Sequence, residues 1–83
     1  MSPWFVYILK SKEQRKFYTG KTDDLEKRLL EHNSRNNKGY TSRFQPWVLV
    51  YSEIQPTEKV ALRREKYFKS AAGRRWLKRN VGL

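Results

Sequence analysis

The chain contains no cysteine and only one histidine among its 83 residues. The missing thiols exclude disulfide bonds, Cys-ligated zinc and Cys nucleophiles, and a single histidine excludes most metal sites built from imidazoles. Long apolar runs are also missing, because the longest uninterrupted one, residues 4–9, is far shorter than the roughly 20 residues of a membrane-spanning helix. No segment has the basic start, apolar run and cleavage site of a secretory signal. We therefore expect a soluble, cytoplasmic protein with no membrane partner.

Acidic residues are scarce, with 8 Asp and Glu against 19 Lys and Arg, a formal net charge of +11. The excess is uneven, since residues 63–83 contain eight basic residues and a single acid. A small domain with this imbalance repels itself unless it meets a polyanion, so nucleic acid is the first candidate partner. The simpler alternative is that the basic residues only keep the protein soluble. If nucleic acid binds, we expect its phosphates to lie on Arg63, Lys69, Arg74, Arg75, Lys78 and Arg79.

The length and the aromatic content predict one small folded domain covering residues 1–83. Aromatic residues make up 14% of the chain and compensate for its low aliphatic content, which argues against disorder. A domain of this size hides only about 60% of the surface that its unfolded chain exposes. Any active site must therefore be shallow.

Three segments rich in β-branched and aromatic residues predict strands. Residues 4–9 and 17–19 are separated by a polar segment, which predicts a hairpin, and Gly20 is expected to end its second strand. Residues 47–51 predict a third strand, entered through Pro46, because proline is tolerated at the first residue of a strand.

Two capping patterns predict helices between and after these strands. Asp23 and Glu26 have the spacing of an N-cap with its reciprocal partner, for a helix that ends near Asn33. Thr57 is expected to cap a second helix that runs to about Ser70. A polar loop rich in Asn, Gly and Ser should precede the third strand, and a short third helix should follow residue 73. The expected order is ββαβαα.

Glu65 stands out, because it borders the apolar stripe of its helix and is the only acid between residues 59 and 83. A carboxylate in this position either neutralises a basic neighbour or binds a cation. The residues alone favour the ion pair and leave the metal ligand as the alternative. The candidate ion-pair partners are Arg63, Arg64 and Lys69.

Two further pairs of residues have both a structural and a chemical interpretation. Tyr7 and Tyr18 lie on the two strands of the hairpin, where tyrosines are usually core residues, but concentrated positive charge can turn a tyrosine into a base. Arg28 and His32 share a helix face, and an arginine fork there matches a phosphate. The alternative is a solvated helix face on which Arg28 pairs with Asp24.

Five short motifs occur in a fixed order along the chain: Val6-Tyr7-Ile8, Tyr18-Thr19-Gly20, Asp24-Leu25 with Arg28, His32-Asn33, and Ala61-Leu62-Arg63-Arg64-Glu65. Together they resemble the GIY-YIG nuclease superfamily. The resemblance is to its single-domain bacterial members, related to the N-terminal domain of an excinuclease protein of nucleotide-excision repair. The sequence departs from the family's name motif at Val6, where the family has glycine, and at Thr19, where it has isoleucine. Neither of the replaced side chains does chemistry.

The resemblance implies an α/β fold with a small three-stranded antiparallel sheet flanked by helices. It also implies hydrolysis of DNA phosphodiester bonds with one divalent metal, Mg²⁺ with Mn²⁺ as the alternative. Tyr7 and Tyr18 match the two motif tyrosines, one of which, Tyr7 in the usual assignment, helps to deprotonate the attacking water. Arg28 matches the arginine that steadies the phosphate, His32 the histidine that follows it, and Glu65 the single carboxylate that binds the metal.

We therefore expect a metal-dependent DNA endonuclease that acts in DNA repair or processing. One alternative is a non-catalytic nucleic-acid-binding module on the same fold, and another is a protein-interaction domain recruited to nucleic acid by its partner. A pure binding module has no need for a carboxylate that faces the phosphate, which favours the enzyme.

Overall fold

The computed structural model describes residues 3–82. It contains the predicted elements in the predicted order, with one short 3₁₀-helix, η1, added inside the predicted loop. No helix of this part of the chain has the length and apolar character needed to cross a membrane. The elements are β1 (Trp4–Ser11), β2 (Phe17–Thr22), α1 (Leu25–His32), η1 (Tyr40–Phe44), β3 (Trp47–Gln55), α2 (Glu58–Lys69) and α3 (Ala71–Val81).

The three strands form one antiparallel sheet in the order β2-β1-β3, which confirms the predicted α/β fold. β1 is central, and Tyr7 lies opposite Gly20 on β2 and Ser52 on β3. The expectation that Gly20 ends its strand is wrong, because β2 continues to Thr22. Within residues 3–82, β2 pairs with β1 alone and is one of the two edges of the sheet.

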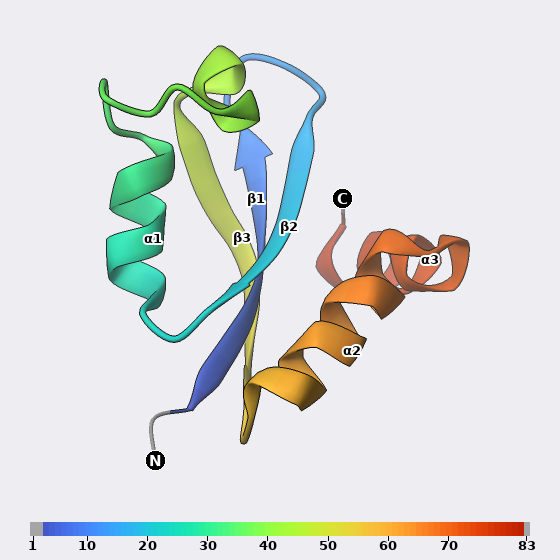
Figure 1. The fold of residues 1–83 in the computed structure, drawn as a ribbon. Coiled ribbons are helices and arrows are strands. Elements are labelled where there is room, and N and C mark those ends of the chain that lie inside the picture. Colours follow the sequence, from blue (N-terminus) through green and yellow to red (C-terminus); the bar gives the residue numbers. More distant parts are fainter. Residues whose placement is uncertain (1–2, 83) are drawn as a thin grey trace.

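Helices cover both faces of the sheet: α1 and η1 lie on one side and α2 and α3 on the other (Figure 1). The side chains of β1 alternate between these two layers, because successive residues of a strand point to opposite faces. The core on the α2–α3 side contains Val6, Ile8, Ala61, Phe68 and Leu77, and the core on the α1 side contains Tyr7, Leu9 and Trp47.

α1 begins one residue later than the sequence suggested. Its N-cap is Asp24, whose Oδ1 accepts a hydrogen bond from the Lys27 backbone nitrogen at 3.1 Å, so Asp23 lies outside the helix. Thr22 holds this turn, since its hydroxyl oxygen accepts from the Asp24 backbone nitrogen at 3.1 Å. This contact with the end of β2 explains why Asp24, and not Asp23, caps the helix.

α2 begins as predicted, with Thr57 as its N-cap. α3 begins earlier than predicted, because the Ser70 side chain caps it and Gly73 lies within its first turn. A Cβ at Gly73 would collide with the backbone of Tyr67 and Phe68, so the missing side chain lets the two helices pack closely.

Candidate active site

The side chain of Tyr7 is the centre of the predicted site. It points to the α1 side of the sheet, is 1% exposed, and lies over Gly20 on the edge strand β2. A tyrosine on a central strand therefore presents its hydroxyl above an edge of the sheet. A hydroxyl buried in this way needs a hydrogen-bond partner.

His32 is that partner, and it links Tyr7 to the loop after α1. The Tyr7 hydroxyl oxygen lies 3.0 Å from His32 Nε2, and His32 Nδ1 lies 2.9 Å from the Thr41 hydroxyl oxygen. Asn37 Nδ2 in turn donates to the same Thr41 oxygen at 2.6 Å. Burial and, after it, the positive charge of Arg28 lower the pKa of His32 to about 4. The imidazole is therefore neutral at neutral pH, and its ring is fixed between Tyr7 and Thr41.

Arg28 lies one turn before His32 on α1 and interacts with the side chain of Tyr7. Its interaction with the Tyr7 hydroxyl is the largest of the effects that raise the pKa of Arg28, so the guanidinium stays charged. Arg28 Nη1 also donates to Glu31 Oε2 at 2.9 Å, so the pairing with Asp24 considered above does not form. This ion pair is solvent-exposed and contributes little, which leaves the arginine fork available to a ligand.

Burial dominates the acid–base state of Tyr7. The pKa of Tyr7 is raised to about 12, because burial outweighs the opposing effect of Arg28; Tyr18 and Glu65 add smaller effects in the same direction as burial. Tyr7 is therefore protonated at neutral pH. It can become a base only when positive charge is added beside it.

Tyr18 completes a cluster of three rings. Its centroid lies 4.7 Å from that of His32 and 6.2 Å from that of Tyr7. Beside the rings is a hollow of about 420 Å³ between α1 and the loop that leads to η1. Its lining includes Tyr18, Arg28, Glu31, His32, Asn37 and Tyr40. The structure thus brings together four of the five residues predicted for catalysis and metal binding.

The fifth, Glu65, approaches from α2 on the other face of the sheet. Its charge is one of the effects that raise the pKa of Tyr7, so the two side chains are electrostatically linked. Glu65 Oε2 also accepts from Lys69 Nζ at 3.0 Å, as the ion-pair interpretation predicts. Arg64 is not a partner, because it forms a bidentate pair with Glu53, with Nε–Oε2 at 2.7 Å and Nη2–Oε1 at 3.0 Å.

Glu65 is suited to a metal that needs few protein ligands. Among residues 3–82 no three Asp, Glu or His side chains gather into a cluster. Zinc, which takes three or four protein ligands, does not fit such a donor set. Mg²⁺ keeps several of its waters and is held by one or two carboxylates together with substrate phosphates, so a single half-buried carboxylate at a shallow site suits it.

The six basic residues predicted to bind phosphate differ in their position relative to a second hollow. Lys69, Arg74 and Lys78 line that hollow, between β2 and α3. Arg63, Arg75 and Arg79 are exposed but are not part of its lining.

Sequence reasoning missed the residues that hold the site together. Asn37 and Thr41 lie in the segment read as a loop, and nothing in their spacing marks them as partners of His32. Asn33 ties the end of α1 to β3, since its Nδ2 donates to the Trp47 carbonyl at 3.0 Å and its Oδ1 accepts from the Trp47 nitrogen at 2.6 Å. The five motifs include Asn33 and Gly20, but the contacts of Asn33 with Trp47 and of Gly20 with Tyr7 were not predicted.

Comparison with known proteins identifies the family. A family model described as the GIY-YIG catalytic domain matches residues 3–80. The chain belongs to the GIY-YIG family. This confirms the resemblance read from the sequence, and GIY-YIG nucleases generally depend on a divalent metal ion.

Relatives of this GIY-YIG domain come from several bacteria. A UPF0213 protein of Staphylococcus saprophyticus is 37% identical over 78 residues, which are 94% of each chain. A UPF0213 protein of Clostridium perfringens is 43% identical over 65 residues, covering 78% of this chain and 69% of the relative. The solution NMR structure of a UPF0213 protein from Bacillus halodurans aligns with a TM-score of 0.57 and 31% identity, over 96% of this chain and 87% of that one. The GIY-YIG domain therefore shares its fold with an experimentally determined structure.

Proposed function

We propose that this GIY-YIG domain is a divalent-metal-dependent endonuclease that hydrolyses DNA phosphodiester bonds in DNA repair or processing. The observation that supports the proposal is the environment of the Tyr7 hydroxyl. It lies over an edge strand and is hydrogen-bonded to His32, and the pKa of Tyr7 is lowered by the positive charge of Arg28 on α1 and raised by the negative charge of Glu65 on α2. A purely structural tyrosine does not require two opposite charges from opposite layers of the fold.

In this proposal His32 orients Tyr7. A neutral imidazole whose Nε2 accepts the Tyr7 hydroxyl proton carries its own proton on Nδ1, which donates to Thr41. The lone pairs of the Tyr7 oxygen are then directed to the substrate and can accept a hydrogen bond from the attacking water. The low pKa of His32 keeps the imidazole in this accepting form at neutral pH.

Arg28 binds the scissile phosphate through its planar fork. The guanidinium is already beside the Tyr7 hydroxyl, so a phosphate held by Arg28 lies within reach of a water held by Tyr7. Charge that develops on the phosphate oxygens in the transition state is offset by this group without further rearrangement.

Glu65 would hold the divalent cation, in exchange for the Lys69 ammonium group. When bound, the cation would polarise the phosphate. Its positive charge would also offset the negative charge of Glu65, which helps to raise the pKa of Tyr7. Tyr7 can then take the proton of the attacking water while its own hydroxyl proton passes to His32 Nε2, which lies 3.0 Å from the Tyr7 oxygen.

The proposal is tested by incubating the protein with branched, flapped, nicked and single-stranded DNAs, with Mg²⁺, with Mn²⁺ or with a chelator. We expect endonucleolytic cleavage of at least one substrate with metal and none with the chelator. DNA binding without cleavage of any substrate in either metal would instead support the non-catalytic binding module.

A further inference from the structure

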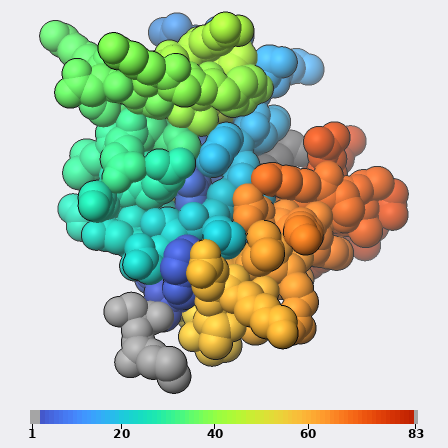
Figure 2. All heavy atoms as spheres, viewed as in Figure 1, coloured from blue at the N-terminus to red at the C-terminus, as the bar shows by residue number. Residues whose placement is uncertain are grey.

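A second hollow, larger than the one at the active site, lies along the outer side of β2. Its volume is about 820 Å³, and its walls come from β2, the end of α2 and the first turns of α3. In the space-filling view the light-blue β2 lies in a recess between the green α1–η1 part and the orange α2–α3 part (Figure 2). We call this hollow the β2–α3 groove. Its lining includes Arg15, Lys16, Phe17, Lys69, Arg74 and Lys78.

The charge of the β2–α3 groove is of one sign. Five of its lining residues are basic and none is acidic. Lys69 is paired with Glu65, whereas Arg15, Arg74 and Lys78 form no ion pair with the described residues, 3–82. Unpaired basic side chains around a concave surface attract a polyanion.

The groove also exposes aromatic rings, which a site for free phosphate does not need. Phe17 is 42% exposed on the edge strand, and Tyr40, on η1, is 57% exposed. Aromatic faces beside a basic groove are the platforms on which unpaired bases stack. In a duplex each base is already stacked on its neighbours, so duplex DNA cannot use these rings.

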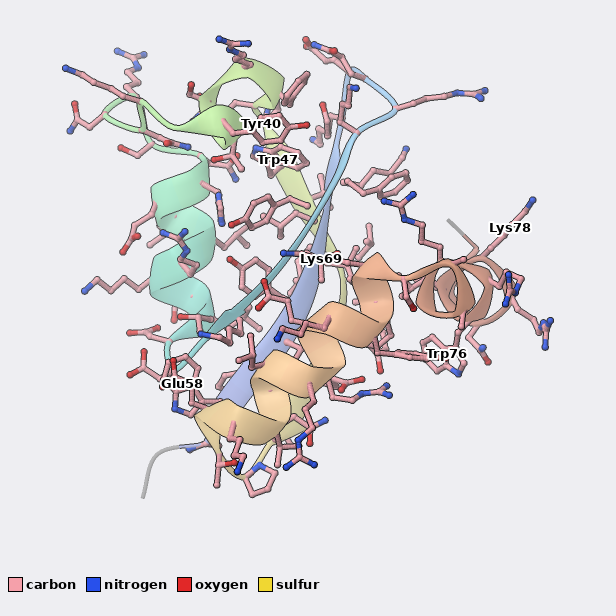
Figure 3. The ribbon with its side chains drawn as sticks, turned by 45° about the vertical axis from the view of Figure 1, so that its right-hand side comes forward. Tyr40, Trp47, Glu58, Lys69, Trp76 and Lys78 are labelled. Carbon is pink, nitrogen blue, oxygen red and sulfur yellow. The ribbon has the colours of Figure 1, made fainter. Side chains whose placement is uncertain are left out.

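The groove is continuous with the active site. Tyr18 and Tyr40 line both hollows, and Lys69, which lines the groove, holds the carboxylate of Glu65. Figure 3 shows Tyr40, Lys69 and Lys78 extending from η1, the end of α2 and α3. A strand in the groove therefore leads to the residues around Tyr7.

We propose that the β2–α3 groove binds a single strand of DNA that continues from the active site. Its phosphates contact Arg74 and Lys78, and its bases stack on Phe17 and Tyr40. The inference rests on the proposed function for the identity of the nucleic acid, but its test requires no cleavage.

The structure offers a matched pair of variants on one helix. Arg74 and Lys78 line the groove, whereas Arg75 and Arg79, at the same i, i+4 spacing, do not. All four side chains are exposed, and alanine is the best helix former, so both double variants should fold. Each removes two positive charges from α3, so their effects on long-range attraction are similar.

The experiment measures the affinity of labelled oligothymidylate, and of a duplex of the same length, by fluorescence anisotropy in chelator over a range of salt. We expect the Arg74→Ala/Lys78→Ala variant to bind the single strand at least about tenfold more weakly than the Arg75→Ala/Arg79→Ala variant. The slope of log K against log salt should also be shallower by about 0.7 for each phosphate that the variant no longer neutralises.

A third variant, Phe17→Leu, tests the stacking platform. Leucine keeps an apolar side chain on β2 but removes the ring, so affinity for the single strand should fall by about tenfold while affinity for the duplex changes little. Equal affinities for the two α3 double variants, or equal losses for single strand and duplex in Phe17→Leu, would overturn the proposal. Absence of cleavage by the wild-type protein in Mg²⁺ would remove the nuclease and leave the binding result to be judged separately.

Discussion

The ring of Tyr7 lies against the backbone of Gly20, its cross-strand partner on β2. A Cβ placed on Gly20 would be 2.5 Å from the Tyr7 hydroxyl oxygen and 2.7 Å from the ring carbon that bears it. Both distances are shorter than the non-bonded contacts that real Cβ atoms make. Glycine at this position is therefore required by the position of the Tyr7 hydroxyl and not by the path of the strand.

We predict that Gly20→Ala impairs cleavage more than it impairs folding. The added methyl group must displace the Tyr7 hydroxyl from His32 Nε2, and a buried ring has little room to move. We expect cleavage to fall by about 10²-fold, because a misplacement of about 1 Å in a catalytic group has effects of this size. Cleavage rates and thermal melts of both proteins measure the two effects. Wild-type rates in a folded Gly20→Ala protein would show that the position of Tyr7 does not matter.

Gly20 also shows why one strand boundary was predicted wrongly from the sequence. Locally a glycine weakens a strand, and the sequence therefore predicted an end that the structure does not have. The pairing of β2 with β1, which continues past Gly20 to Thr22 opposite Phe5, outweighs that local tendency, and the composition of the segment does not show this pairing. The same holds for α1, whose start depends on the contact of Asp24 with Thr22.

Features controlled by nearby residues were predicted well. The Thr57 cap, the three strands and the element order follow from local composition and spacing. The chain Tyr7–His32–Thr41 joins segments 25 and 9 residues apart, and no local pattern encodes it. The split of the basic residues between the β2–α3 groove and the open surface likewise depends on how α3 docks.

We predict that Arg28→Ala reduces cleavage by about 10²–10³-fold and changes DNA affinity little. The guanidinium is only one of 19 basic groups that attract DNA, so its loss weakens binding little. It interacts with the Tyr7 hydroxyl, however, and is therefore placed to stabilise the transition state. Arg28→Lys should restore little activity, because an ammonium group cannot reproduce the planar fork.

The matched control for Arg28 is Lys27→Ala, which removes one exposed charge from the neighbouring position of α1. It should leave both cleavage and affinity close to those of the wild type. Parallel losses of cleavage and affinity in Arg28→Ala would place Arg28 in the general phosphate-holding surface.

Burial of His32 predicts a pH dependence of stability. The folded protein holds His32 neutral down to about pH 4, whereas the unfolded chain protonates it near the ordinary pKa of 6.5. Between these values the unfolded state binds more protons, so the free energy of unfolding falls as the pH falls, by at most about 3 kcal/mol. Urea unfolding at about pH 7.5, 6.5, 5.5 and 5.0 measures how the free energy of unfolding changes above and within this window.

His32→Gln provides the reference for that measurement. It lacks the titrating imidazole, and carboxylates contribute little above about pH 5. Its slope between pH 6.5 and 5.0 should therefore be close to zero, even if its overall stability is lower. Identical slopes for the two proteins would mean that the pKa of His32 is the same in the folded and unfolded states, near its ordinary value of 6.5.

Glu65→Gln tests the central claim, because the two interpretations of this carboxylate predict different results. If Glu65 holds the divalent cation, cleavage in Mg²⁺ should be lost, and DNA affinity should be unchanged or higher because a negative charge near the phosphate is gone. The control is Glu58→Gln, which breaks the comparable ion pair with Lys21 at the start of α2 and should leave cleavage unchanged. We expect that only Glu65→Gln loses cleavage and that thermal melts show both variants to be folded. Cleavage by Glu65→Gln at the wild-type rate would reduce Glu65 to the ion-pair partner of Lys69 and contradict the mechanism.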